Sequence, residues 1–415
     1  MNIILFDDST WEELLPLTFT RPVSEIRIGI LTIREKWEKI TSSKVSYFTK
    51  SYLQEKFQLT IGNDNLFINS SLLPTKEIID LILSCTENLS YTYKNQILFV
   101  RFNKNQAEEF TQTFKTKCKS IELQSVSKLN SFCDIFIKNG EELEKDFSLI
   151  TKGRISQKLS NTNQVLGKEN IFIEENAKIE CSCLNATSGH IYIGKDTEIM
   201  EGCNIRGSFA LCKHSTIKLG AKIYGPTTIG QHSKVGGEIN NSVIFGYSNK
   251  AHDGFLGNSV IGEWCNIGAD SNNSNLKNNY TNVKMWNYPK KQFTDTGLMF
   301  AGLIMGDHSK CGINTMFNTG TVVGVSANLF GAGFHRNFVP SFTWGGPSGY
   351  ITYQLKKAVE VAKIVMSRRD IELNVIEENI LKFVYENSEV YRQLQAKSSR
   401  QSAVGSRQSA VSSKQ

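Results

Sequence analysis

The sequence lacks the cysteine patterns of disulfide frameworks and of metal centres. Nine cysteines occur in 415 residues, and none forms a Cys-x-x-Cys pair. Cys181 and Cys183 lie close together, but they have no partners at the spacing of a metal site. Because scattered thiols in odd number are typical of a reducing compartment, we expect a cytoplasmic protein and no metal held by cysteine or histidine.

The sequence also lacks long apolar runs and a strong excess of one charge. No apolar run approaches the roughly 20 residues of a membrane span, and the apolar start from Met1 to Leu5 leads into Asp7 and Asp8, unlike a signal peptide. The net charge of +7 is modest, and no basic face carries interleaved aromatic residues. We therefore expect no membrane and no nucleic-acid partner, whereas anionic small molecules such as phosphates remain compatible.

What the sequence does have is a ladder of aliphatic residues spaced six apart. A period of six fits neither a helix nor an ordinary strand. It is the signature of a hexapeptide β-helix, in which each short strand and turn points one side chain inward. The ladder comprises Ile193, Ile199, Ile205, Leu211, Ile217, Ile223, Ile229 and Val235.

Changes of pattern divide the chain into five parts. Residues 1–140 alternate apolar strands with helical stripes, which predicts an α/β domain with a Rossmann-like sheet. Residues 141–170 are polar and irregular, as in a connector. Residues 171–345 are predicted to form the β-helix. Residues 346–396 are predicted to be a helical segment, whose apolar stripe from Ala358 to Met366 packs against the β-helix or a partner subunit. Residues 397–415 are predicted to be a low-complexity, disordered tail.

The six-residue ladder is interrupted in two places. It slips after Val235, and we expect it to resume at Phe255, Ile261 and Ile267. Residues 270–299 are rich in Asn and have no six-residue period, which predicts a loop that projects from the solenoid. The period returns at Met305, Cys311, Phe317, Val323 and Leu329.

The stretches 236–241 (GGEINN), 250–258 (KAHDGFLGN) and 261–269 (IGEWCNIGA) resemble a known family. This is the acetyltransferase half of the bifunctional sugar-1-phosphate nucleotidylyltransferase/acetyltransferases that make UDP-N-acetylglucosamine. The resemblance implies a left-handed β-helix, acetyl-CoA as acyl donor and a homotrimer. By position it implies that His252 is the catalytic base. It implies sugar-phosphate contacts for Lys222, Asn240, Phe255, Asn266 and Asn275.

The segment 14–22 (LLPLTFTRP), followed by Gly29 and by residues 35–37 (EKW), looks like the shortened nucleotidyltransferase domains of the same family. The resemblance implies nucleotide binding by Arg21 and Arg27, with Mg²⁺ if nucleotidyl transfer takes place. The Gly-rich phosphate loop of the family is replaced by residues 7–11 (DDSTW), and Val23 stands where a lysine is expected.

Acyl transfer to an amine requires a base, donors for the oxyanion and an aligned thioester. His252 suits the first role, because the intrinsic pKa of histidine is about 6.5. Backbone N–H groups such as those of Gly268 or Ala269 suit the second. Lys310 and Arg336 in the last coils are candidates to bind the phosphates of acyl-CoA.

Each of these assignments has a plain alternative. His252 is otherwise a surface histidine at a coil corner, and Lys310 and Arg336 are otherwise solvated cations. The Asn-rich stretch 272–279 either binds sugar hydroxyls or simply tolerates turns. Asp7 and Asp8 either bind Mg²⁺ or are solvated loop residues. The remaining histidines are expected at exposed turns: His190, His214, His232, His308 and His335.

The sequence thus predicts an enzyme of sugar-nucleotide biosynthesis for the cell envelope. The β-helix domain is expected to transfer an acyl group from acetyl-CoA to an amino-sugar phosphate. The N-terminal domain is a candidate for nucleotidylyl transfer from UTP or dTTP. Two alternatives are a nucleotidylyltransferase with a purely structural β-helix and a non-catalytic trimeric regulator that binds a sugar nucleotide.

Overall fold

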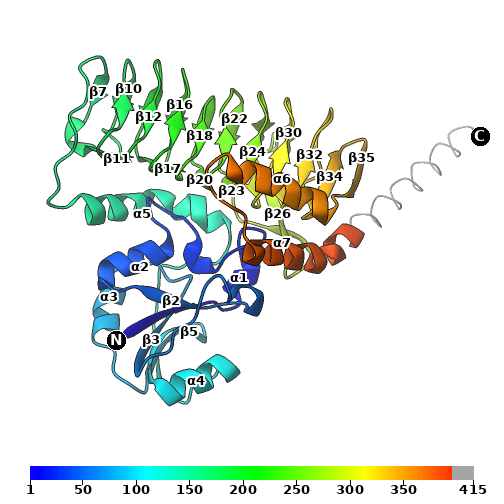
Figure 1. The fold of residues 1–415 in the computed structure, drawn as a ribbon. Helices are drawn as coiled ribbons and strands as arrows, with labels where there is room; N and C mark the ends of the chain where they lie inside the picture. The colour runs from blue at the N-terminus through cyan, green and yellow to red at the C-terminus, as the bar shows by residue number, and fades with distance from the viewer. Residues whose placement is uncertain (395–415) are drawn as a thin grey trace, which may run out of the picture.

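The computed structural model describes residues 1–394, which form an α/β domain, a long parallel β-solenoid and two C-terminal helices (Figure 1). The fold class predicted from the sequence is confirmed. The predicted tail, residues 397–415, lies outside the described residues, as does the very end of the predicted helical segment.

The N-terminal domain is built on a six-stranded mixed sheet in the order β2-β1-β3-β5-β4-β6. β1 pairs in parallel with both β2 and β3, whereas β5 is antiparallel to its neighbours. The strands are β1 (Asn2–Phe6), β2 (Val45–Phe48), β3 (Asp64–Asn69), β4 (Leu89–Tyr93), β5 (Gln96–Asn103) and β6 (Lys119–Glu122). The helices are α1 (Thr10–Glu13), α2 (Ile33–Thr41), α3 (Lys76–Leu83), α4 (Lys104–Thr113) and α5 (Cys133–Thr151).

The predicted boundary at residue 140 falls inside α5, and this helix extends into the region predicted to be an irregular connector. The polar residues that hid this helix are buried: Asn139, Glu142 and Asp146 are at most 2% exposed. Lys36 of α2 forms ion pairs with Glu142 and Asp146. A buried charge network therefore interrupts the apolar face of α5, which also buries Ile135, Phe136, Leu143 and Phe147.

The solenoid has three flat faces, each a parallel sheet except that the last strand of the third face is antiparallel to its neighbour. Residues 18 apart lie on the same face, and all eight ladder residues from Ile193 to Val235 are at most 2% exposed, as predicted. The first face comprises β7 (Gln164–Leu166), β10 (Cys183–Asn185), β13 (Asn204–Arg206), β16 (Lys222–Tyr224), β19 (Glu238–Asn240) and β22 (Phe255–Gly257). The second face comprises β8 (Ile171–Ile173), β11 (Ile191–Ile193), β14 (Phe209–Leu211), β17 (Thr227–Ile229), β20 (Val243–Gly246), β23 (Val260–Glu263), β28 (Ile304–Met305), β31 (Val322–Val323) and β33 (Phe338–Val339). The third face comprises β9 (Lys178–Ile179), β12 (Glu198–Ile199), β15 (Thr216–Ile217), β18 (Lys234–Val235), β21 (Asn249–Lys250), β24 (Asn266–Ile267), β29 (Lys310–Cys311), β32 (Asn328–Leu329), β34 (Thr343–Gly346) and β35 (Gly349–Thr352).

The inward row continues through the slip at Ile239 and Ile244, and its residue in β22 lies one position later than the expected Phe255. Leu256, at 2% exposure, is the inward residue of β22 and pairs with Ile239, whereas Phe255 is only half-buried. The step from Leu256 to Ile261 is five residues, so the spacing of six from Phe255 to Ile261 was a coincidence. This correction places the Phe255 ring outside the inward row.

The interruption at 270–299 is partly solenoid and partly a projection. Residues Asn272–Asn273 form β25, which pairs with β30 (Met316–Phe317) and so belongs to the coils. The rest carries an antiparallel hairpin, β26 (Lys284–Asn287) and β27 (Gln292–Asp295). The hairpin contacts the N-terminal domain, since Asn287 donates a hydrogen bond to Glu13 and the Tyr288 ring packs against Phe19.

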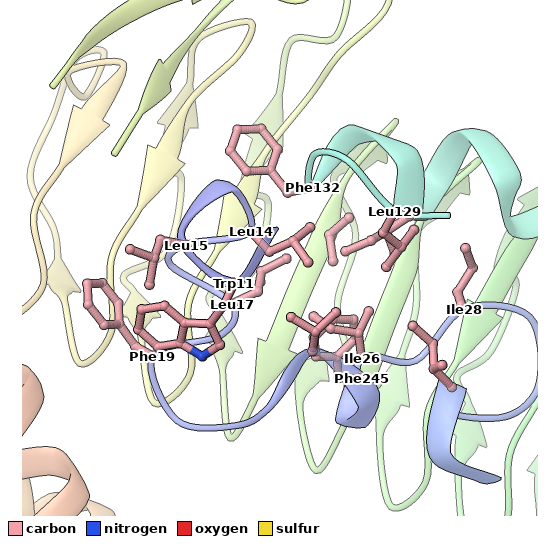
Figure 2. Packing of buried hydrophobic residues seen from close by; sticks show 14 of the residues in the cluster. Trp11, Leu14, Leu15, Leu17, Phe19, Ile26, Ile28, Leu129, Phe132 and Phe245 are labelled. Carbon is pink, nitrogen blue, oxygen red and sulfur yellow. The ribbon is translucent and has the colours of Figure 1, made fainter. Parts of the chain in front are cut away.

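One hydrophobic core joins the N-terminal domain, the second face and the C-terminal helices α6 (Leu355–Ser367) and α7 (Val375–Asn387). Figure 2 shows Ile26 beside Phe245 of β20, with Leu14, Leu17 and Phe19 of the loop after α1 in the same cluster of buried side chains. The segment 14–22 is therefore a docking segment between domains. The predicted packing role of the stripe from Ala358 to Met366 is confirmed, because Ala358, Ala362 and Met366 are buried in this core.

Candidate functional site

His252 stands exposed at the corner between the third face and the first, between β21 and β22. Two grooves meet at this corner. One, of about 500 Å³, runs over the third face, and we name it the acyl groove. The other, of about 530 Å³, includes Gly236, Gly237 and Asp253, and we name it the corner groove. Ala251, His252 and Ala269 line both, so His252 is accessible from two sides.

The acyl groove brings together five of the residues predicted from the sequence. Parallel pairing aligns Asn249, Asn266 and Lys310 across β21, β24 and β29. The turn after β24 adds Gly268 and Ala269, and the corner adds His252. The five predicted residues that line the groove are His252, Asn266, Gly268, Ala269 and Lys310.

The electrostatics of the acyl groove are one-sided. Its lining includes His252 but no aspartate or glutamate. The four cations in the lining are Lys234, Lys310, Arg368 and Arg369. Within the described residues none of these four forms an ion pair. Lys310 is largely buried, which lowers its pKa, and its Nζ donates to the His308 carbonyl oxygen at 2.9 Å. Arg369 lies 3.4 Å from Asn249 Oδ1.

Three of these cations were missed from the sequence. In the sequence, Lys234 cannot be distinguished from the solvent-facing residues of the other hexads. Arg368 and Arg369 follow the apolar stripe of α6, which was interpreted only as a packing helix. The detectable signal was the pair of adjacent arginines at the end of a helix that must lie on the solenoid.

The two predicted oxyanion donors differ in availability. The Gly268 N–H donates to the Cys311 carbonyl oxygen at 3.1 Å, so it is already used in the hydrogen bonding between coils. The Ala269 N–H forms no hydrogen bond within residues 1–394. Ala269 is therefore the better candidate for an oxyanion donor.

The predicted sugar-phosphate residues divide between two faces. Lys222, Asn240 and Phe255 lie in β16, β19 and β22 of the first face, where Glu238 pairs with both Lys222 and Phe255. Asn275 lies beside them, because a Cβ added to Gly257 would meet its side-chain nitrogen at 2.7 Å. Asn266 lies on the third face instead. Within one chain the His252 corner separates these two groups, and their roles stay predictions.

Arg336 does not line the acyl groove. It lies just before β33, and its guanidinium stands over the Tyr350 ring at 5.3 Å. Lys310 alone of the two predicted phosphate ligands borders the groove.

The loop after β1 is filled by its own side chains. Asp7 Oδ1 accepts a hydrogen bond from the Val23 N–H, and Asp7 Oδ2 accepts one from the Thr49 hydroxyl. Burial raises the pKa of Asp7 to about 7. Asp7 is therefore not a solvated loop residue.

Asp8 is also engaged, by the Thr10 N–H and by Asn69 Nδ2, each at 2.8 Å. Mg²⁺ requires near-octahedral oxygen ligands and retains several waters. Because protein donors occupy oxygens of both carboxylates, Asp7 and Asp8 as placed do not fit a Mg²⁺ site. Among residues 1–394 no group of three or more His, Cys, Asp or Glu side chains is arranged to hold a metal.

Arg21 and Arg27 point at the solenoid. Arg21 forms a buried ion pair with Asp307 and a second with Glu263 at 3.2 Å. Burial alone would lower the pKa of Arg21, but the charges of Asp307 and Glu263 raise it. Arg27 Nε donates to the Phe245 carbonyl oxygen at 3.2 Å. Both guanidiniums are thus engaged between the domains, and nucleotide binding by them stays a prediction.

These arginines line a second cavity, of about 220 Å³, where the N-terminal domain, solenoid and C-terminal helices meet. We name it the junction cavity. Its four cations, Arg21, Arg27, Arg34 and Lys56, face five carboxylates: Glu25, Glu35, Glu263, Asp307 and Glu377. Lys56 pairs with Glu377, and Arg34 pairs with Glu25. Trp264 lines both this cavity and the acyl groove.

Of the five histidines expected at exposed turns, only His214 is exposed, and His190 and His232 are partly buried. His335 is 1% exposed, and its Nδ1 lies 3.0 Å from the Tyr350 hydroxyl. His308 is partly buried, and burial lowers its pKa to about 3. His214, His232 and His308 do lie at coil corners, but their rings belong to a stack that also includes Tyr247 and Trp264. The stack repeats once per coil, a regularity that the hexad pattern alone does not reveal.

No helix within residues 1–394 has the length and apolarity to cross a membrane.

Comparison with known proteins supports the resemblance. Residues 3–155 match the family model described as sugar nucleotidyl transferase. The bifunctional sugar-1-phosphate nucleotidylyltransferase/acetyltransferase of Sulfurisphaera tokodaii is 30% identical over 160 residues, 38% of this chain and 37% of that protein. The bifunctional protein GlmU of Methanococcus maripaludis is 27% identical over 290 residues, 66% of this chain and 62% of that protein. The matches therefore span less than two thirds of these relatives.

Among solved structures, the N-acyltransferase AntD of Bacillus cereus, in complex with dTDP and 3-hydroxybutyryl-CoA, is 14% identical with a TM-score of 0.23. The match covers 52% of this chain and all of that one. A likeness at this level carries no argument about function. The family model and the two curated relatives are more informative: residues 3–155 match the sugar nucleotidyl transferase family, and the chain resembles the bifunctional nucleotidylyltransferase/acetyltransferases.

Proposed function

We propose that this protein is an acyltransferase of sugar-nucleotide biosynthesis, which transfers an acyl group from acyl-CoA to an amino-sugar phosphate. One observation carries the proposal: the groove beside His252 contains four cations and no carboxylate. Coenzyme A carries a diphosphate and a 3′-phosphate, and cations without competing carboxylates favour such a ligand. Acetyl-CoA is the donor that the resemblance implies.

The chemistry follows from the two grooves at the corner. The thioester lies in the acyl groove, and the amine approaches from the corner groove. The amine nitrogen attacks the thioester carbonyl while the His252 imidazole accepts its proton. The Ala269 N–H donates to the resulting oxyanion. The carbon–sulfur bond then breaks, and the thiolate leaves and takes up the proton from His252.

The acceptor is proposed to be an amino sugar with a phosphate or nucleotide. Lys222 supplies a cation on the first face, and Asn240, Asn275 and the Phe255 ring supply amide groups and a stacking surface. Because Asn266 lies on another face, one complete acceptor site requires residues from a second subunit. This requirement supports the homotrimer that the resemblance implies. The cytoplasmic location stays a prediction.

Nucleotidylyl transfer by the N-terminal domain is a second candidate function, because residues 3–155 match the sugar nucleotidyl transferase model. The filled loop after β1 and the paired Arg21 weigh against it. A structural β-helix with an active N-terminal domain, or a regulator without either activity, are the remaining outcomes of the test.

The test incubates the full-length protein with acetyl-CoA and glucosamine 1-phosphate, and separately with UTP or dTTP, Mg²⁺ and sugar 1-phosphates. We expect thiol release in the first assay. Pyrophosphate release alone would favour the nucleotidylyltransferase, and release of neither product would favour the regulator. A His252→Ala variant that releases thiol as fast as the unaltered protein would overturn the assignment of the base.

A further inference from the structure

Lys250 occupies a position in the solenoid that otherwise holds aliphatic residues. It is the inward residue of β21, between Val235 and Ile267 in the row along the third face. Its side chain is 2% exposed. Lysine is almost never fully buried unless its ammonium finds partners. The row therefore contains one residue that costs stability where a leucine or valine would not.

The ammonium finds its partners at the His252 corner. Lys250 Nζ donates to the His252 carbonyl oxygen at 2.8 Å and to the Gly236 carbonyl oxygen at 3.0 Å. These two carbonyls belong to successive coils on either side of the corner groove. The lysine thus ties the turn 251–254, which carries His252, to the coil before it.

The remaining surroundings of Lys250 are weakly charged. A cavity of about 10 Å³ borders it, with Ser271 and Asn273 among the lining residues. Asp253, Asp270 and the Cys311 thiol are the titratable groups that act on it. No carboxylate within the described residues forms an ion pair with Lys250, so the two carbonyls are its hydrogen-bond partners.

We propose that Lys250 is a positioning residue for acyl transfer, which holds the His252 turn from inside the solenoid by its hydrogen bonds to the carbonyls of His252 and Gly236. The inference rests on the proposed function. It explains why a lysine stands in an aliphatic row: the position trades stability for a fixed corner. A misplacement of the base by about 1 Å can cost ~100-fold in rate.

The proposal has a consequence for the pH dependence. Burial lowers the pKa of Lys250 from 10.5 to about 8, and Asp253, Cys311 and Asp270 oppose that shift. Below this pH the ammonium offers three donors, and above it the neutral amine offers two weaker ones. We expect the turnover rate to decline above about pH 8 as the hold on the turn weakens.

The test compares the full-length protein with Lys250→Met and Lys250→Gln, and with Lys178→Met as a control on an exposed lysine of the same face. Met restores the apolar row, so K250M keeps or raises the melting temperature. We expect its kcat for thiol release to fall at least tenfold, its KM for acetyl-CoA to change less than twofold, and its alkaline decline to disappear. The kcat of K250Q falls less, because its side-chain amide keeps two N–H donors.

Amide hydrogen exchange supplies a readout that does not depend on activity. Residues 251–254 exchange faster in K250M than in the unaltered protein, while the earlier coils are unchanged. Wild-type kcat and pH profile in K250M or K250Q, or unchanged exchange at 251–254, would overturn the inference. If the unaltered protein releases no thiol, the acyl-transfer proposal and the catalytic inference resting on it both fail, whereas the exchange data still show whether Lys250 holds the turn.

Discussion

Two cavities share the Trp264 side chain, and they differ in how their charges are arranged. The junction cavity has cations and carboxylates from three parts of the chain, and these pair with one another. The acyl groove has cations without carboxylates. Paired charges hold domains together, whereas unpaired cations in a groove remain available for an anionic ligand. The contrast supports our proposal that the acyl groove binds the ligand and that the junction cavity is structural.

The N-terminal domain and the His252 corner, which both resemble the family, differ in the same way. In the N-terminal domain, the positions where the family binds nucleotide phosphates are occupied by Asp7 and Asp8, which are hydrogen-bonded within the protein. At the His252 corner, the matching residues border open grooves. A family motif is therefore more informative when its side chains remain unpartnered in the fold.

The largest effect is expected from His252→Ala. Removal of a general base typically costs between ~10² and 10⁴ in rate. We expect that loss in kcat for thiol release, with little change in the KM for acetyl-CoA, since the ring contributes to chemistry rather than to phosphate binding. His214→Ala, at an exposed corner of an earlier coil, serves as the control. Equal loss in both variants would contradict the role of His252.

The second effect tests the junction cavity. Arg21→Met leaves Asp307, whose side chain is 4% exposed, without its guanidinium partner. Breaking a buried pair in this way costs about 3–5 kcal/mol. We therefore expect the free energy of unfolding to fall by this amount, and urea denaturation measures it. Arg368→Met, in the acyl groove, changes that free energy by less than about 0.5 kcal/mol. Similar losses in both variants would remove the distinction between the cavities.

The third effect tests the acyl groove. The double variant Arg368→Met/Arg369→Met removes two of its four cations. We expect the KM for acetyl-CoA to rise about tenfold and to depend less steeply on salt, because screened charge pairs account for the loss. Lys357→Met, on the exposed side of α6 and outside the groove, is the matched control. An unchanged KM in the double variant would place the phosphates elsewhere.

The last prediction concerns Asp7. Its pKa of about 7 in the fold lies above 3.8, the value of an ordinary aspartate. Between these values the folded state binds more protons than the unfolded state, so stability falls as the pH rises from about 4 to 7. Asp7→Asn removes this dependence and is more stable than the unaltered protein above pH 7. Melting temperatures from pH 4 to 8 measure the difference, and a constant difference would contradict the buried carboxyl.

The regular part of the β-helix was predictable because each hexad places one aliphatic residue in the core. The interruptions were harder to predict from the sequence. Leu256 and Phe255 are both apolar, and only the pairing of Leu256 with Ile239 shows which of them points inward. α5 was missed because its buried face contains Glu142 and Asp146, whose partner Lys36 is about 110 residues distant in sequence. Long-range charge pairing leaves no local pattern.

The candidate site was predictable where it follows one strand register, as for Asn266 and Lys310. Arg368 and Arg369 reach the groove only because α6 returns over the solenoid, which no local pattern specifies. Lys250 was hidden by the slip in the ladder, which obscured its inward position.

The most direct test of the contrast between the cavities is calorimetric titration of coenzyme A into three proteins: the unaltered chain, R368M/R369M, and Arg34→Met, which removes a cation of the junction cavity. We predict that coenzyme A binds the unaltered chain and R34M with equal affinity, and R368M/R369M about tenfold more weakly. Equal affinity for R368M/R369M, or a loss confined to R34M, would contradict the assignment of the acyl groove.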